Sequence, residues 1–129
     1  MTDHEDLIRY LKGVRRIVIN AQHGGFGLSA EAERLYLKRS LIEYTEQDRA
    51  SRDETERLGR LITVDDEVWN SSLINRDDPV LVSVVTDLQK RSWGTWSKLK
   101  IVEIPADVKW KIDDYDGMEW VAEVHRTWH

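Results

Sequence analysis

The segment that most constrains the fold of this chain is RIVINAQHGGFGLSAEAERLYL, residues 16–37. An apolar, β-branched run ends at Asn20, a loop with three glycines follows, and a helical pattern opens after Ser29. The run predicts a short buried strand, and a serine followed by two glutamates predicts the start of a helix. A buried strand that leads through a short loop into a helix requires a fold in which helices pack on a sheet.

The rest of the chain continues this alternation of helices and strands. Apolar periodicity predicts helices over residues 2–14, 29–44 and 79–91. It predicts strands over residues 15–20, 61–64, 68–74, 99–104, 108–113 and 118–128, the last of which also permits a short helix. We therefore expect one domain of α/β or α+β class over residues 1–129, with a mixed sheet, helices packed on it and a C-terminal antiparallel β-meander over 99–129.

Two segments stand outside this core. Residues 1–14 predict an N-terminal helical extension whose apolar stripe ends at Val14. Residues 46–60 are almost all charged or small, so they are either a mobile loop or a solvated helical extension. The third helix has the clearest start, because Asp78 can cap it and Pro79 suits its first position.

The C-terminal hairpin has a predictable register. The dipeptide Asp-Gly at 116–117 suits the two central positions of a tight turn, where positive φ angles are needed. Counting outward from this turn places Trp120 opposite Asp113 and Trp110 opposite Glu123. The two tryptophans then lie on opposite faces of the hairpin, so one of them points away from the core.

Composition restricts the classes of function. The 129-residue chain has no cysteine, which excludes disulfides and thiolate zinc sites and is typical of a reducing compartment. A formal net charge of −5 provides no basic field for nucleic acid. Neither a signal-peptide pattern nor a long apolar run occurs in the sequence. We expect a cytoplasmic protein that binds neither nucleic acid nor a membrane.

The glycine loop is the first candidate binding site, because amides at a helix N-terminus can bind an anion where glycines permit close approach. Its sequence lacks the lysine of a Walker A motif and the spacing of a dinucleotide fingerprint. The glycines also fit a strand-to-helix turn, and we favour this structural interpretation. The candidate ligand-binding residues are His23, Gly24, Gly25, Gly27 and Ser29, with Arg126 and Trp128 as a clamp for a phosphate or a base.

Acidic and histidine residues provide no convincing catalytic set. Asp113 and Asp114 are adjacent on a predicted strand and point to opposite faces, so they cannot easily share a metal. Glu123 and His125 share a face and could be a catalytic pair or bind zinc, but no third ligand is evident, and we favour a cross-strand ion pair. We expect no catalytic residue, no metal and no cofactor, and we consider an enzyme the less favoured class.

The tryptophans are the second candidate for binding. The chain has six tryptophans and one phenylalanine. Trp93 and Trp96 flank Gly94 in a predicted loop, and Trp110 and Trp120 lie on the two arms of the predicted hairpin. Core packing is the alternative for each of them. As a set, they predict an exposed aromatic surface that binds a partner.

Four blocks of the sequence, IVINAQHGGFGLS, RDDPVLVSVV, LKIVEIP and IDDYDGMEWVAEVHRTW, resemble a family of small, largely uncharacterised proteins of tailed phages and prophages. The resemblance covers residues 16–128, and the order of the blocks makes it specific. It implies a phage origin and an accessory or host-interaction role, and it brings no established activity. The N-terminal helix and residues 46–60 depart from the commoner form of the family.

Two functions follow as hypotheses. In the first, the protein is an accessory binding protein of the infected or lysogenic host's cytoplasm, where its aromatic C-terminal surface engages or inhibits a host protein or binds a second copy of the chain. An anti-defence role belongs to this class. In the second, the glycine loop binds a nucleotide signal and sequesters or hydrolyses it. We rank the binding protein first, because it needs no catalytic group.

Overall fold

The computed structural model describes residues 13–49 and 59–124. Its central element is a two-stranded antiparallel sheet of β1 (Val14–Asn20) and β5 (Leu99–Pro105), paired from Val14 opposite Pro105 to Asn20 opposite Leu99. Ile17 and Val18 are neighbours on β1 and both are fully buried. Because neighbouring side chains of a strand point to opposite faces, both faces of this sheet are covered.

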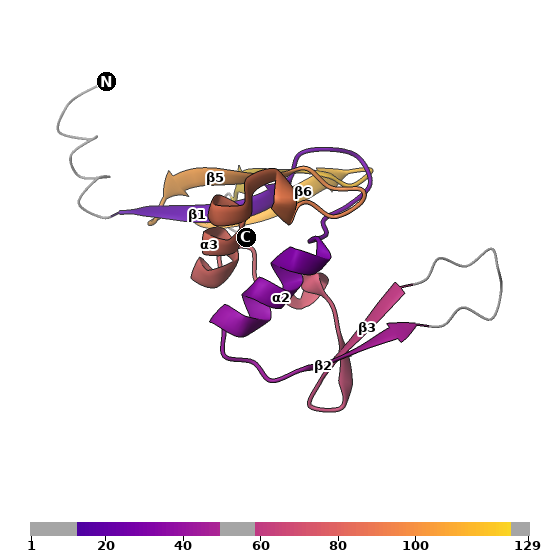
Figure 1. Ribbon diagram of the computed structural model, residues 1–129. Coiled ribbons are helices and arrows are strands. Elements are labelled where there is room, and N and C mark those ends of the chain that lie inside the picture. The colour runs from indigo at the N-terminus through magenta and orange to yellow at the C-terminus, as the bar shows by residue number, and fades with distance from the viewer. Residues whose placement is uncertain (1–12, 50–58, 125–129) are drawn as a thin grey trace, which may run out of the picture.

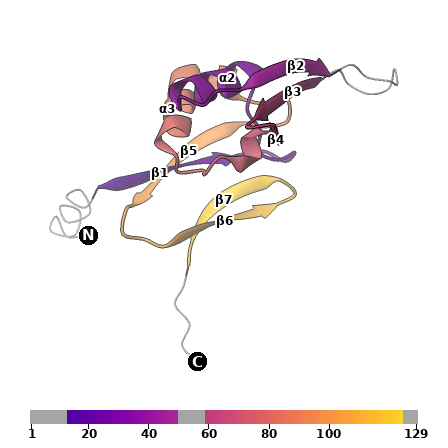
Figure 2. The same ribbon diagram turned by 90° about the horizontal axis from the view of Figure 1, so that it is seen from below.

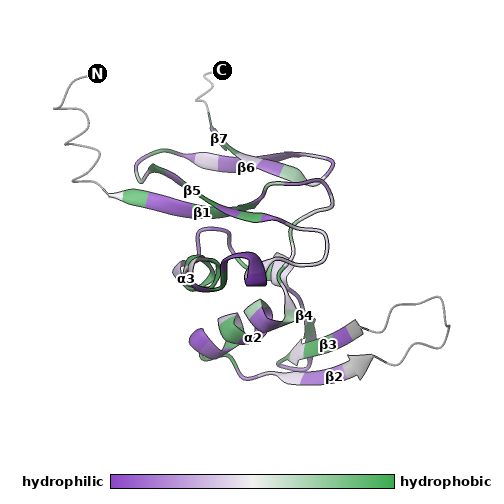
Figure 3. Cartoon of the chain, turned by 45° about the horizontal axis from the view of Figure 1, so that its top comes forward, coloured by the Kyte–Doolittle hydropathy of each residue, from purple (hydrophilic) through white to green (hydrophobic). Residues whose placement is uncertain are grey.

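Two helices lie on one side of the β1–β5 sheet: α3 (Pro79–Leu88) packs on the sheet, and α2 (Ala30–Arg39) packs against α3. Figure 2 shows them on one side of the sheet, and Figure 3 shows that α3 is mostly apolar whereas α2 alternates between apolar and polar residues. Leu37, Leu81 and Val84 are fully buried there and pack in one cluster with Val18. Burial of a side chain of this size contributes roughly 1.5–3 kcal/mol, so this layer is the main hydrophobic core.

A hairpin covers the opposite face of the sheet. It consists of β6 (Trp110–Tyr115) and β7 (Met118–Glu123), and it lies against β1 (Figure 2). The predicted register is confirmed: Trp120 is opposite Asp113 and Trp110 is opposite Glu123. Residues 118–123 are therefore a strand and not a short helix.

A small antiparallel sheet lies beside α2 (Figure 1), with strand order β2 (Thr45–Arg49), β3 (Gly59–Val64) and β4 (Glu67–Trp69). The prediction of a loop or a helical extension over residues 46–60 is wrong at both ends of that segment, because they pair as strands. β3 and β4 join through Asp65 and Asp66, both at positive φ. A 3₁₀ turn, η1 (Ser71–Leu73), follows β4, so the predicted strand 68–74 is shorter than expected.

Side-chain caps fix where the helices begin. Ser29 accepts a hydrogen bond from the amide of Ala32, and Asp78 accepts one from the amide of Val80, as predicted. Both helices end earlier than their periodicity predicts. α2 ends at Arg39, shortly before Leu41 at positive φ, and α3 gives way to the 3₁₀ turn η2 (Gln89–Ser92).

The prediction of an α/β or α+β domain is confirmed in its α+β form, as a single compact arrangement of helices and strands with a C-terminal hairpin. The strands form three small antiparallel sheets over residues 13–49 and 59–124, where the sequence predicted one mixed sheet. The first strand of the predicted meander, β5, pairs with β1, and only the last two form a hairpin. No helix in the part of the chain that the structure describes is long and apolar enough to cross a membrane.

Candidate functional site

The glycine loop packs against the turn of the C-terminal hairpin. A Cβ atom added to Gly117 would lie 2.4 Å from the Gly25 nitrogen and 2.8 Å from the Gly24 nitrogen. The Gly24 amide donates a hydrogen bond to the Asp116 carbonyl over 3.3 Å. Amides that were candidates for binding an anion therefore face another part of the same chain.

The loop at residues 93–97 packs against the same glycines. A Cβ atom added to Gly24 would lie 2.7 Å from the Trp96 carbonyl oxygen, and one added to Gly94 would lie 3.0 Å from the Gly27 carbonyl carbon. Gly27 also accepts hydrogen bonds from the Gly94 amide and from the Ser97 hydroxyl, at 3.2 and 2.6 Å. Three backbone segments meet at the loop. Their close approach requires a glycine at position 24, and a positive φ favours glycine at position 25, whereas a Cβ atom added to Gly27 would meet no atom within 4 Å.

Ser29 and His23 have partners inside the protein. The Ser29 hydroxyl donates to the Arg91 carbonyl over 2.5 Å, besides accepting from Ala32. The His23 Nδ1 lies 3.3 Å from the Asp116 carbonyl, and its ring meets Tyr115 edge-on at a centroid distance of 6.1 Å. The structure thus brings His23, Gly24, Gly25, Gly27 and Ser29 together, while Arg126, Trp128 and His125 lie outside the described residues.

Asn20 organises the loop, although the sequence marked it only as the end of a strand. It is fully buried, and its side-chain amide donates to the carbonyls of Gln22 and Gly117, both over 2.7 Å. Its side-chain carbonyl accepts from the Lys98 amide at 3.0 Å. One side chain thus bonds to the glycine loop, the hairpin turn and the start of β5.

A buried ion pair attaches the hairpin to the core. Arg76 donates two hydrogen bonds to Glu119, of 2.6 and 2.9 Å, and their side chains are only 19% and 11% exposed. The guanidinium of Arg76 lies 3.6 Å above the centre of the Phe26 ring, a favourable cation–π position. Glu119 also accepts from the Asn20 main-chain amide at 2.8 Å. Because Arg76 and Glu119 are 43 residues apart in sequence, the periodicity of apolar residues did not predict their contact.

The tryptophans divide into buried and exposed members. Trp93 and Trp110 are partly buried, and Trp93 packs against the core cluster. Trp96 is 62% exposed and Trp120 is 46% exposed. Trp69, which the sequence did not single out, stacks on Tyr36 at a centroid distance of 6.1 Å.

The outer face of the hairpin carries exposed apolar side chains. The register places Tyr115 directly opposite Met118 and puts Trp120 on the same face, away from Glu119. Tyr115 is 73% exposed, Met118 37% and Trp120 46%. We call these three residues the outer hairpin face. Such residues on one side of a short hairpin are typical of an interaction surface.

Neither acidic pair forms a shared site, and Asp77 and Asp78 serve structural roles. Asp77 accepts a hydrogen bond from Arg15 at 2.8 Å, and Asp78 accepts one from the Tyr36 hydroxyl at 2.6 Å besides capping α3. Asp113 and Asp114 lie at successive positions of β6 and so on opposite faces, as predicted. Over residues 13–49 and 59–124, no group of His, Asp and Glu has a geometry that could hold a metal ion.

The β2–β3 strand pair is joined to α2 by a charge network. Glu46 accepts hydrogen bonds from Arg34 and Arg60, which lower the pKa of its carboxyl to about 2. Arg60 also pairs with Glu33 over 2.7 Å, but burial raises the pKa of the Glu33 carboxyl. The network orients β3 against the helix.

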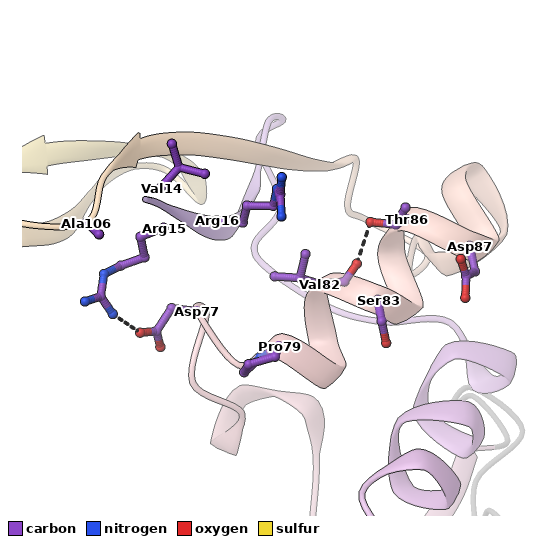
Figure 4. A pocket seen from close by; sticks show the side chains of 10 residues that line it. All are labelled: Val14, Arg15, Arg16, Asp77, Pro79, Val82, Ser83, Thr86, Asp87 and Ala106. Atoms are coloured by element: carbon purple, nitrogen blue, oxygen red, sulfur yellow. Dashed lines mark hydrogen bonds and ion pairs between the residues drawn. The ribbon is translucent and has the colours of Figure 1, made fainter. Parts of the chain in front are cut away.

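A cleft of about 730 Å³ lies between β1 and α3 (Figure 4). Its walls combine aliphatic side chains with two arginines of β1 and two aspartates. Arg15 pairs with Asp77 at its mouth, and the Arg15 Nε is buried without an acceptor among the described residues. The lining residues are Val14, Arg15, Arg16, Asp77, Pro79, Val82, Ser83, Thr86, Asp87 and Ala106.

Comparison with known proteins gave no match: no protein-family model fits the chain, and no curated protein or solved structure is significantly similar to it.

Proposed function

We propose that this chain is a small accessory binding protein that engages a host protein through the outer hairpin face. The observation that carries the proposal is the exposure of Tyr115, Met118 and Trp120 on one side of a hairpin whose other side is fixed to the core. Exposed aromatic and methionine side chains are enriched in interfaces, where their burial supplies much of the binding energy.

The resemblance of four sequence blocks to phage and prophage proteins supports the biological setting of this proposal. The setting that we propose is the cytoplasm of an infected or lysogenic bacterium, where the protein would act on a host process such as defence. A binding role needs no catalytic group. This agrees with the structural roles of Asp77 and Asp78.

The alternative, a nucleotide-binding protein that uses the glycine loop, gains no support from the described residues. The Gly24 amide and the Ser29 hydroxyl already bond to Asp116 and Arg91. Gly117 occupies the space beside the Gly24 and Gly25 nitrogens. A nucleotide at this loop would have to displace the hairpin turn.

The test is site-specific photocrosslinking in host lysate. p-Benzoylphenylalanine replaces Tyr115 in the full-length chain, and the control carries it in place of Val68, which is 63% exposed on β4. We expect a discrete adduct from position 115 and none from position 68. An adduct of twice the chain mass would identify a second copy as the partner. Labelling that is equal at both positions, or no adduct at position 115, would contradict the proposal.

A further inference from the structure

The main-chain hydrogen bonds of β1 alternate in direction. The Gly13 carbonyl accepts from the Ala106 amide over 3.2 Å, and the Ala21 amide donates to the Lys98 carbonyl over 2.8 Å. Both bonds extend the ladder to β5. In an antiparallel ladder, alternate residues bond to the same neighbour, so the odd-numbered residues of β1 face β5.

The even-numbered residues face the other way. The Val18 amide donates to the Arg76 carbonyl over 2.8 Å, and the Asn20 amide donates to a carboxylate of the hairpin. By the same alternation, the main-chain N–H and C=O groups of Val14 and Arg16 point away from β5.

These outward groups of Val14 and Arg16 form an open strand edge. In residues 13–49 and 59–124, no hydrogen bond reaches their N–H or C=O groups. Val14 is 50% exposed and the side chain of Arg16 is 55% exposed. Arg76, in the segment that leads into α3, bonds to Val18 and closes the edge there. The edge is open at Val14 and Arg16. Unpaired main-chain groups in a row are a template for another strand.

The cleft shown in Figure 4 adjoins this edge. Val14 and Arg16 form one wall, and Pro79 and Val82 at the start of α3 form another. A strand edge beside an apolar groove and a helix suits an extended peptide. The backbone of such a peptide pairs with the edge while alternate side chains enter the groove.

The arginines define the chemistry of the occupant through their unused donors, since the two aspartates of the cleft, Asp77 and Asp87, are themselves paired with arginines. Arg15 contacts Asp77 through one Nη atom, and its Nε is a buried donor without an acceptor among the described residues. Arg16 contacts Glu103 through its Nε. Each guanidinium has five donors, so both retain donors for a carboxylate.

A second copy of this chain does not fit the same edge. Antiparallel pairing of two β1 edges about their open residues would place Arg15 opposite Arg15 of the other copy. Like charges directly opposite each other destabilise a strand pair. The unused guanidinium donors of Arg15 and Arg16 therefore favour a different polypeptide that carries carboxylates.

We infer that the edge of β1 at Val14–Arg16 binds an extended acidic segment of a partner polypeptide by strand addition, with an apolar side chain of that segment in the cleft between β1 and α3. This surface is separate from the outer hairpin face, so either surface can be disproved without the other.

The test uses capped heptapeptides of alternating valine and glutamate, VEVEVEV, titrated into the ¹⁵N-labelled full chain. We expect saturable shifts of the Val14 and Arg16 amides and slower exchange of both. The lysine analogue VKVKVKV and a VEVEVEV peptide with alternate amides N-methylated should bind at least about tenfold more weakly, since they lose charge pairing or main-chain donors.

A pair of variants separates the main chain from the side chain. Arg16→Pro removes the outward N–H and leaves every bond to β5, as proline is tolerated at a free strand edge. Arg16→Ala removes only the side chain. We expect about tenfold weaker binding for Arg16→Pro than for Arg16→Ala.

Three results would overturn the inference. The first is the absence of saturable shifts at Val14 and Arg16 with VEVEVEV up to about 1 mM. The second is equal affinity of the N-methylated peptide, which tests main-chain pairing even if Arg16→Pro does not fold. The third is a shift map centred on the outer hairpin face.

Discussion

Two antiparallel strand pairs in this protein are attached to the rest of the fold in different ways. β6–β7 is held through its inner face, by the buried pair of Glu119 with Arg76 and by direct backbone contact at Gly117. β2–β3 is held by the charge network of Glu46, whose partner Arg34 has a side chain that is 49% exposed. The comparison indicates that the first attachment is essential to the fold and the second contributes much less, because solvent and salt screen exposed charges.

The largest effect is expected at Glu119. Glu119→Ala leaves the Arg76 guanidinium partly buried without its counter-ion and removes the acceptor of the Asn20 amide. Breaking a buried pair in this way costs about 3–5 kcal/mol. Urea unfolding measures the loss. The matched control is Glu123→Ala, at an exposed position on the same face of β7, with an expected change within about 0.5 kcal/mol. Equal effects of the two variants would contradict the role of the ion pair.

The second effect concerns the contact between the hairpin turn and the glycine loop. Gly117→Ala combines a positive φ with a Cβ atom 2.4 Å from the Gly25 nitrogen, and we expect a loss of about 3 kcal/mol or more. Gly25→Ala has a positive φ and no atom within 4 Å of the added Cβ, so the expected loss is about 1–2 kcal/mol. Thermal and urea unfolding compare the two. If both variants lost the same stability, close approach would not be the reason for Gly117.

The third prediction concerns acid. The pKa of the Glu46 carboxyl is about 2, below its unfolded value of about 4.3, so its ion pairs stabilise the fold above pH about 4.3 and are lost as the pH falls through about 2. Burial raises the pKa of the Glu33 carboxyl, so the ionisation of Glu33 destabilises the fold as the pH rises, which is opposite to the effect of Glu46. ¹³C NMR of the carboxyl groups measures both values. Glu46→Gln should flatten the pH dependence of the unfolding free energy between pH about 2 and about 4.3. A Glu46 carboxyl whose pKa has its ordinary value would contradict the network.

The smallest expected effect is that of nucleotides. Mono-, di- and cyclic nucleotides should leave the thermal midpoint unchanged, because the glycine loop contacts its own hairpin turn. A ligand that bound at this loop and was present at 100 times its dissociation constant would stabilise by about 2.7 kcal/mol. A shift of that size, lost in Ser29→Ala, would restore the nucleotide hypothesis.

Local features of the fold could be predicted from the sequence. The caps at Ser29 and Asp78 and the register around Gly117 depend on residues a few positions apart, and all three are confirmed. The strands at the ends of 46–60 were missed because Glu46 and Arg60 pair with charges on α2 and not with a hydrophobic face.

Long-range features of the site could not be predicted in this way. The close approach of Gly24 to Trp96, the hydrogen bonds of Asn20 and the Arg76–Glu119 pair all depend on segments that meet only in the folded chain. The sequence does show a glutamate, Glu119, within the alternating pattern of β7. It does not show that the partner of Glu119 is Arg76, 43 residues away.

The central claim is that the two faces of the C-terminal hairpin have different tasks, and Trp110 and Trp120 test it most directly. The unfolding free energy and the yield of the adduct from p-benzoylphenylalanine at position 115 are measured for Trp110→Ser and Trp120→Ser. We predict that Trp110→Ser loses about 2–3 kcal/mol and keeps the adduct in its folded fraction. We predict that Trp120→Ser changes stability by less than about 1 kcal/mol and loses the adduct. A Trp120→Ser variant that keeps the adduct and loses as much stability as Trp110→Ser would contradict the claim.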